Sequence, residues 1–313
     1  TSLKHSCAEL YIRRSEDART SLEKRNLLDK AKNICIQLRR EAKDSYPVGT
    51  IVKAGINWLE HMHPNDDLLQ SEDVEGLIKN IEKDLKNGLQ EFPGDSFLLA
   101  QEARLAKLLS EDTRLVTALR KSFAGNHRNS GVALQLATSF ENAGNLADAQ
   151  QTLKAAIDAN RGHQRLHFAF AVLLEKHGLG RPDEILYHYK HSFHPGDNNR
   201  DAQLRYGRQL FLAGEYEASK EVFQSLRSVR LPNDIKQRLV YPLDGEFTGR
   251  VSRIEAWYCL ICRNGDGAIV SLQADSIGDK VNWRDLHRHQ ELIFRIAFSM
   301  YGPQALDVHA ITN

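Results

Sequence analysis

The sequence has little of what marks secreted, membrane-spanning or strongly charged proteins. Its 313 residues include only four cysteines, too few for a disulfide-stabilised scaffold. No apolar run approaches the roughly 18 residues that suggest a membrane-spanning helix, so we expect no membrane segment. Lys and Arg number 42 and Asp and Glu 41, and the net charge of +1 excludes a polybasic nucleic-acid binder. The first residues resemble neither a signal nor a transit peptide, so we expect a cytoplasmic protein.

The motifs of several enzyme classes are also missing. There is no Gly-x-x-x-x-Gly-Lys-Ser/Thr phosphate loop, no Gly-x-Ser-x-Gly and no His-Glu-x-x-His. Cys259 and Cys262 have the spacing of one half of a zinc knuckle, but no second pair exists, and on a strand this spacing places the thiols on opposite faces. His188, His191 and His194 can share a helix face, but we interpret them as its polar end. We therefore expect no enzymatic activity, no metal and no cofactor.

Helical periodicity covers the first 230 residues or so. Between Ser21 and about Lys43, apolar residues recur every three or four positions, which predicts one amphipathic helix. Pro47 disfavours helical backbone at the residue before it, so we expect that helix to stop there and a shorter one to follow. His63-Pro64-Asn65-Asp66-Asp67 then breaks the pattern. We therefore predict an N-terminal helical region at residues 1–62.

Beyond this region the sequence repeats. Four segments begin at intervals of 34, 34 and 36 residues, at Ser96, Ser130, Gln164 and Arg200. Each has a small residue seven places after its start, an apolar residue three places later, and then a turn at Ser110, Gly144, Gly178 or Gly214. A single helix pair is too small to bury its own apolar face, so stacked helical hairpins are the expected structure.

This pattern resembles the tetratricopeptide repeat (TPR) family. Ala-Gly-Asn-Leu-Ala-Asp-Ala at 143–149 and Ala-Gly-Glu-Tyr-Glu-Ala at 213–218 are similar to its usual turn. The resemblance covers about residues 77–230 and implies a helical solenoid whose first helices bind a protein or peptide. On that groove it places basic and apolar side chains that suit an acidic, hydrophobic partner. They are Arg104, Lys107, Leu134, Asn142, Arg165, Phe168, Lys176, Arg208 and Phe211.

After residue 231 the period changes to that of strands. Alternating or continuous apolar residues at 247–254, 258–261, 269–270, 292–298 and 302–308 predict roughly five strands. Asn264-Gly265-Asp266-Gly267 has the composition of a hairpin turn. We therefore predict a mostly α-helical chain with a small all-β domain at residues 241–313.

The β region resembles a cold-shock-type OB barrel. Gly249-Arg250-Val251 is similar to that family's opening strand, and Trp257–Ile261 and Ala268–Ser271 stand where it carries its two RNA-binding motifs. Most of the family's stacking aromatics are replaced here, and residues 241–313 carry a net charge of −2, from seven basic and nine acidic side chains. The candidates that remain for a nucleic-acid face are Arg253, Trp257, Tyr258, Arg263 and Lys280.

Two functions stay open at this point. The first is a non-catalytic recognition scaffold that binds a protein or peptide in the TPR groove. The alternative is single-stranded RNA or DNA sensing through the OB-like barrel. The succession of helical region, repeats and barrel resembles the sensor part of STAND-type NTPases, including bacterial antiviral ones. That resemblance implies that the chain is the C-terminal part of a larger multidomain protein.

Overall fold

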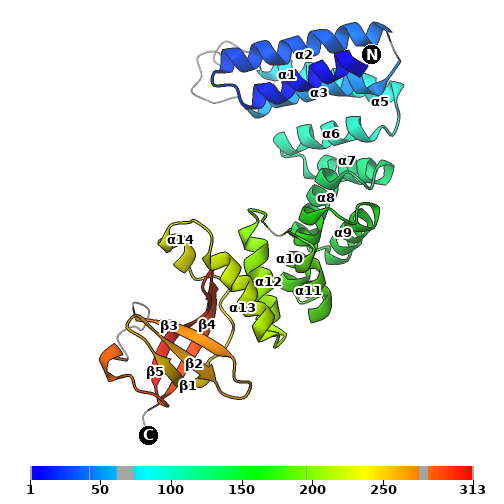
Figure 1. Ribbon diagram of the computed structural model, residues 1–313. Coiled ribbons are helices and arrows are strands. Elements are labelled where there is room, and N and C mark those ends of the chain that lie inside the picture. The colour runs from blue at the N-terminus through cyan, green and yellow to red at the C-terminus, as the bar shows by residue number, and fades with distance from the viewer. Residues whose placement is uncertain (1, 42, 62–73, 195, 275–280, 312–313) are drawn as a thin grey trace. The chain divides into compact units, whose positions relative to one another are not determined.

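Helices followed by a small sheet build the chain in a computed structural model (Figure 1). The structure describes residues 2–41, 43–61, 74–194, 196–274 and 281–311. They form two compact units, Thr1–Arg161 and Gly162–Asn313. The predicted break at residues 63–67 lies outside the described residues.

The described part of the first unit consists of helices. They are α1 (Ser2–Glu16), α2 (Ser21–Glu41), α3 (Ser45–Glu60), α5 (Val74–Glu91), α6 (Ser96–Leu108), α7 (Asp112–Gly125), α8 (Ser130–Asn142) and α9 (Leu146–Ala159). The apolar stripe predicted for α2 is buried at Leu28, Ala31 and Cys35 against α1 and against Trp58 of α3. Pro47 lies in the first turn of α3, where a proline is tolerated because that backbone N–H has no helical partner.

The four predicted repeat starts coincide with the starts of four helices. Ser96 begins α6, Ser130 begins α8, Gln164 begins α10 (Gln164–His177), and Arg200 begins α12 (Arg200–Leu212). Asp95, Asn129 and Asn199 cap three of these helices by accepting a hydrogen bond from a backbone N–H. The predicted turn residues have left-handed backbone, with φ of 58° at Ser110, 77° at Gly144, 61° at Gly178 and 81° at Gly214. The TPR-like repeat is therefore confirmed.

The second unit combines two helix pairs with the sheet. Besides α10 and α12, its helices are α11 (Pro182–Lys190), α13 (Tyr216–Arg227), α14 (Asn233–Gln237) and the short 3₁₀ helix η2 (Trp283–Asp285). Its strands are β1 (Phe247–Ile254), β2 (Tyr258–Arg263), β3 (Ile269–Gln273), β4 (Glu291–Ser299) and β5 (Gly302–Ala310). The strands close into a barrel in the order β1-β2-β3-β5-β4. Neighbouring strands are antiparallel except β3 and β5, which pair in parallel. This is the OB-like barrel predicted from the sequence.

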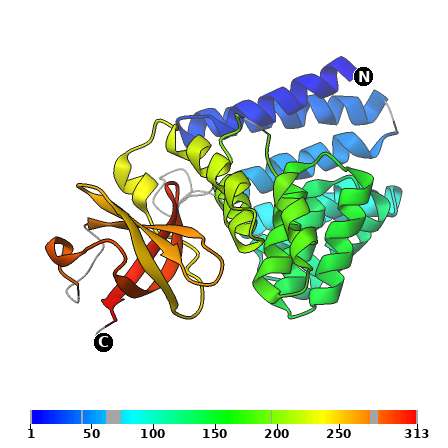
Figure 2. The same ribbon diagram turned by 60° about the horizontal axis from the view of Figure 1, so that its bottom comes forward.

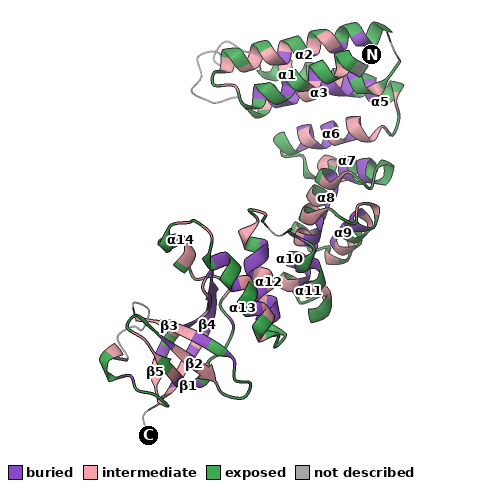
Figure 3. Cartoon of the chain, in the orientation of Figure 1, coloured by how far each residue is buried: buried purple, intermediate pink, exposed green. Residues whose placement is uncertain are grey.

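The core of the barrel continues into the last helix pair. Phe211 of α12 and Phe223 of α13 belong to the same apolar cluster as the barrel interior. The ring of Phe298 on β4 lies 5.6 Å from the ring of Phe211 and 6.3 Å from that of Phe223. Figures 1 and 2 both show α13 beside the barrel, and Figure 3 shows buried residues on α12 and β4. Helices and barrel therefore pack as one body within the second unit.

Candidate binding surfaces

The groove residues predicted on α6 have different environments. The Arg104 guanidinium pairs with the carboxylate of Glu60 and donates a 2.7 Å hydrogen bond to Asn57 Oδ1, both on α3. Its charge is thus neutralised within the first unit, which corrects the expectation that Arg104 is available to a partner. Lys107, one turn further along α6, is exposed.

The predicted residues on α8 and α10 keep their access to solvent. Asn142 is exposed at the last position of α8, and Leu134 is half-buried two turns earlier. On α10, Arg165 and Lys176 are exposed at opposite ends of the helix. Phe168 is half-buried between them, with its ring 6.2 Å from that of Tyr189.

The residues predicted on α12 are covered by the chain itself. Phe211 is only 3% exposed because it packs against Phe298 of the barrel. The Arg208 side chain is 15% exposed; it pairs with Glu175, and its guanidinium carbon lies 5.8 Å from the centre of the Phe298 ring. Arg208 and Phe211 therefore do not line an open groove, and the prediction is corrected at these two positions.

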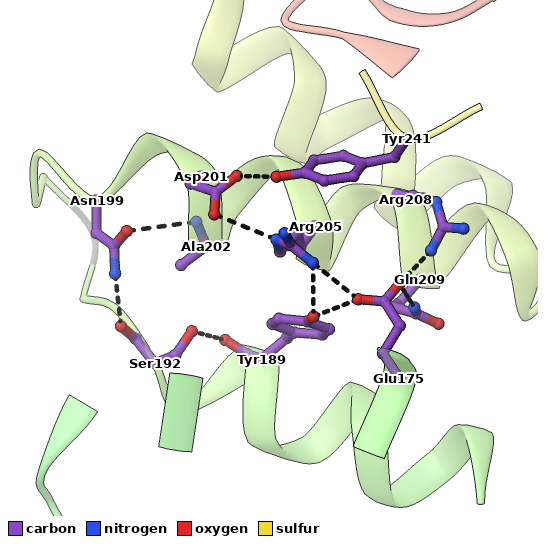
Figure 4. A network of polar contacts seen from close by, with 10 residues as sticks. All are labelled: Glu175, Tyr189, Ser192, Asn199, Asp201, Ala202, Arg205, Arg208, Gln209 and Tyr241. Carbon is purple, nitrogen blue, oxygen red and sulfur yellow. Dashed lines mark hydrogen bonds and ion pairs between the residues drawn. The ribbon is translucent and has the colours of Figure 1, made fainter. Parts of the chain in front are cut away.

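Glu175, at the end of α10, is the centre of a polar network (Figure 4). Its carboxylate accepts hydrogen bonds from Tyr189 Oη and Arg208 Nη1, from Arg205 Nη1 at 3.1 Å and from Gln209 Nε2 at 2.7 Å. Burial, followed by the hydrogen bond to Glu175, raises the pKa of Tyr189. Two cations on one carboxylate in a largely buried place have a structural role: they join α10 to α12.

Tyr241, in the linker before the barrel, extends this network. Its hydroxyl donates to Asp201, and its ring lies 4.2 Å from the guanidinium carbon of Arg205 (Figure 4). Burial, followed by that hydrogen bond, raises the pKa of Tyr241 to about 12. The linker thus covers part of α12, which the sequence did not predict. The left-handed backbone of Tyr241, with φ of 53°, is unusual for a non-glycine residue.

The predicted nucleic-acid face is only partly assembled. Trp257 is 75% exposed and Tyr258 is 37% exposed. Arg253 is exposed beside Glu255, with which it forms an ion pair. The Arg263 side chain is only 14% exposed, because it pairs with Asp266 and lies over the rings of Phe211 and Phe247. Arg263 is therefore not a surface cation, and Lys280 lies outside the described residues.

The turn between β2 and β3 is joined to the helices through Asp266. The hydrogen bond from Arg263, followed by the one from Tyr216 Oη, holds the pKa of Asp266 well below its usual range. Tyr216 begins α13, so the interaction connects the barrel to the helix pair. It explains in physical terms why Arg263 is directed toward the helices.

A cleft that the sequence analysis missed lies between α13 and the outer surface of the barrel. Its volume is about 760 Å³. Residues of α13 line one side and residues of β2 and β3 line the other, and we call the space between them the barrel cleft. Its lining includes Lys220, Phe223, Arg227, Tyr258, Leu260 and Ile269. The alternation of outward side chains along β2 and β3 was a signal for this surface, but only the packing of α13 beside it forms a cleft.

The cysteine and histidine motifs form no metal site. Cys259 is buried in the barrel and Cys262 is directed outward, and burial raises the pKa of Cys259 to about 11. Nδ1 of His188 lies 2.8 Å from Nδ1 of His167, so the two rings share a hydrogen bond. Among the residues that the structure describes, no group of three metal-ligating side chains is positioned to hold an ion. In the same residues, no helix is both long and apolar enough to cross a membrane.

Several solved structures are similar to a part of the chain at low sequence identity. The pilF protein of Pseudomonas aeruginosa matches over 72% of this chain and 92% of its own, with 12% identity and a TM-score of 0.47. A thermophilic TPR protein of Thermus thermophilus matches over 65% and 99%, with 16% identity and a TM-score of 0.39. YrrB, a TPR protein with an unusual peptide-binding site, matches over 61% and 89%, with 14% identity and a TM-score of 0.42. Neither a sequence-family profile nor a curated protein matches the chain.

Proposed function

We propose that this chain is a recognition scaffold that binds a protein or peptide through the first helices of its repeats. The observation that carries the proposal is the exposure of Lys107, Asn142, Arg165 and Lys176 on α6, α8 and α10. Half-buried apolar side chains lie on the same helices, at Leu134 and Phe168. Exposed polar groups beside apolar anchors are what a bound helix or peptide uses. The proposed site excludes Arg104 and Arg208, which form ion pairs with Glu60 and Glu175, and Phe211, which is buried.

The wider context of the protein is also a proposal. We retain residues 1–62, 77–230 and 241–313 as the proposed domains. The succession of these three parts is the support for a sensor role in a larger STAND-type NTPase, with antiviral defence as its setting. All four cysteines are free thiols, which supports a cytoplasmic location. In this proposal the chain senses a partner and performs no chemistry.

Site-specific photo-crosslinking tests the recognition function. A photoreactive phenylalanine is placed at Lys107 or Asn142 on first helices, and at Lys154 or Lys190 on second helices as matched exposed controls. In a lysate of the source organism, we expect discrete protein adducts from the first-helix positions and none from the controls. Equal adducts from both kinds of position would contradict the proposal.

Single-stranded nucleic-acid binding by the barrel is the second candidate. It is supported by the 75% exposure of the Trp257 side chain next to Tyr258, because exposed aromatics can stack on bases. The same photoreactive residue at Trp257 would then give RNA or DNA adducts. Binding would also weaken steeply with salt, as phosphate contacts release counterions. Adducts that contain only protein would exclude this candidate.

A further inference from the structure

We propose that the barrel cleft binds an extended segment of a partner protein that carries both apolar and acidic side chains. This adds a second site to the recognition function proposed above and rests on it only for the protein nature of the ligand. Four features of the cleft carry the inference: its size, its floor, its apolar rim and its cations.

The size and the floor suit a short peptide segment. A volume of about 760 Å³ lies within the roughly 300–1,000 Å³ of typical ligand sites. Leu260 on β2 pairs with Ser271 on β3, so their outward side chains form one surface on the floor. Phe223 and other residues of α13 form the opposite wall. The cleft is therefore a lined space between two rigid elements, which can hold a ligand without rearrangement of the backbone.

Exposed apolar side chains of the barrel gather at this cleft. In the described part of the barrel, three large apolar residues are exposed: Trp257, Tyr258 and Ile269, with exposed fractions of 75%, 37% and 47%. Tyr258 and Ile269 line the cleft, and Trp257 is adjacent to Tyr258 in the chain. Apolar groups that gather in this way, bordered by polar residues, mark an interaction site more often than scattered ones do.

The cations of the cleft lie on α13. Nε of Arg227 donates a 3.1 Å hydrogen bond to the carbonyl of Tyr301, and no carboxylate of the described residues forms an ion pair with it. Lys220 pairs with Glu217, which also lines the cleft, at 3.0 Å, but these side chains are 59% and 85% exposed. An exposed pair of this kind is weak, so a ligand carboxylate can replace Glu217. The wall of the cleft is therefore complementary to acidic side chains.

An extended peptide can satisfy the floor and the wall together. Its alternate side chains point to opposite sides, so apolar residues can enter between Leu260 and Ile269 while acidic residues approach α13. Nucleic acid fits less well, since a single-strand site needs several stacking aromatics and a basic track along the backbone. The cations that line the cleft are Lys220 and Arg227, and the carboxylate of Glu217 lines it too, so the described lining has no basic track along which a phosphate backbone could run.

Fluorescence anisotropy with two defined probes tests this site on the full chain. The probes are fluorescein-labelled, amidated nonapeptides of alternating Glu and Leu, or of alternating Lys and Leu. We expect the Glu/Leu peptide to bind at least tenfold more tightly than the Lys/Leu peptide. Ile269→Ser and Lys220→Gln should each weaken its binding at least fivefold. Leu212→Ser is the matched apolar control, since Leu212 is 46% and Ile269 47% exposed, and Lys190→Gln is the charge control. Both controls should stay within twofold of the parent protein.

The outcomes separate this proposal from the function of the repeats. Lys107→Glu combined with Arg165→Glu should leave binding of the Glu/Leu peptide unchanged, because neither residue lines the cleft. If that double variant abolishes binding and the cleft variants do not, the cleft proposal fails and the repeat proposal is supported. Equal affinity for the two peptides, or no measurable binding of the Glu/Leu peptide, would also overturn it. Tighter binding of a single-stranded oligouridylate, lost in the cleft variants, would assign the cleft to nucleic acid instead.

Discussion

Gly207 of α12 lies against the ring of Phe223 of α13, so closely that a Cβ atom at position 207 would come within 3.0 Å of Phe223 Cζ. Phe223 is 1% exposed and stacks on Phe298 of the barrel. The hydroxyl of Ser219 donates a 2.8 Å hydrogen bond to the carbonyl of Gly207 from the same side. The missing side chain at position 207 thus lets the helix pair close over an aromatic ring that also belongs to the barrel core.

Gly207→Ala should destabilise the second unit. Overpacking in a core costs about 1–3 kcal/mol, and the gain in helix propensity returns at most about 1 kcal/mol. The Phe223 ring cannot easily move away, because Phe298 lies behind it. We expect a net loss of about 1 kcal/mol in urea denaturation. Gly131→Ala on α8 is the control, since a Cβ there meets only the Asn129 side chain at 3.5 Å. A stabilised Gly207→Ala protein would show that the ring has room to shift.

Ala149→Leu should destabilise the first unit by overpacking the α8–α9 pair. Ala149 is fully buried at 0% exposure, and the additional carbons have no space, so we expect a loss of about 1–3 kcal/mol. Asn142→Leu adds a larger side chain at an exposed position of the preceding helix, and its thermal melt should stay close to that of the parent. Similar melts for the two variants would mean that the assignment of buried and exposed repeat positions is wrong.

Glu175→Gln should disrupt the polar network of the second unit. Arg205 and Arg208 would lose their shared carboxylate, and their side chains are only 19% and 15% exposed. Breaking a buried ion pair costs about 3–5 kcal/mol, and the partial exposure here lowers our expectation to about 2–3 kcal/mol. Glu221→Gln, at an exposed position of α13, should have almost no effect on denaturation. An equally small change for Glu175→Gln would show that the two arginines find other acceptors.

The stability of the second unit should fall in mild acid because of His188. Burial, followed by the charges of His167 and His191, lowers the pKa of His188 to about 4 from the usual 6.5. Between these values the unfolded chain binds a proton that the folded chain does not, so stability rises with pH across the window. The contribution is fully present above about pH 6.5 and lost as the pH falls toward 4. At about 1.36 kcal/mol per pKa unit, the loss near pH 4.5 is on the order of 2–3 kcal/mol.

The test compares denaturation at pH 4.5 and 7.5 in two variants. His188→Asn should have a smaller difference between the two pH values than the parent protein. His127→Asn, at an exposed position, should keep the parent's difference. If both variants retain the full pH dependence, the acid sensitivity comes from other groups.

Local signals in the sequence were sufficient for the elements of the fold. Gly144, Gly178 and Gly214 stand where the backbone has positive φ, a conformation that glycine adopts without strain, so the residue type itself indicates these turns. Ser110 has the same left-handed backbone, with φ of 58°, and there only the repeat spacing indicates the turn. The apolar alternation of β1 and the Asn-Gly-Asp-Gly turn after β2 are equally local. The apolar periodicity of a helix or strand and the residue types of a turn involve only positions close together in the chain, so a single sequence is enough to recognise them.

Long-range pairing decided which predicted site residues are accessible, and this was not visible in the sequence. Arg104 pairs with Glu60, 44 residues earlier, and Arg208 pairs with Glu175, 33 residues earlier. Phe211 has the spacing of an exposed groove residue but packs against a strand that begins at Glu291. The barrel cleft likewise depends on where α13 lies beside β2 and β3. Spacing gives the face of a helix, whereas the partner of that face depends on tertiary packing.

The continuous core leads to a last prediction: the barrel alone should be much less stable than the second unit as a whole. A fragment of residues 241–313 lacks Phe211 and Phe223, and it exposes Phe298, which is 0% exposed in the intact protein. Truncation of one buried phenylalanine to alanine costs about 3–5 kcal/mol, and loss of both rings approaches the roughly 5–15 kcal/mol that stabilises a typical domain.

We expect residues 162–313 to melt in a single transition that far-ultraviolet circular dichroism detects for helices and strands together. Residues 241–313 should melt at least 15 °C lower or fail to fold. Phe223→Ala in the longer fragment should lower the melting of helices and strands alike. An isolated barrel that melts at the temperature of residues 162–313 would show that the strands hold their own core and that α12 and α13 only cover it.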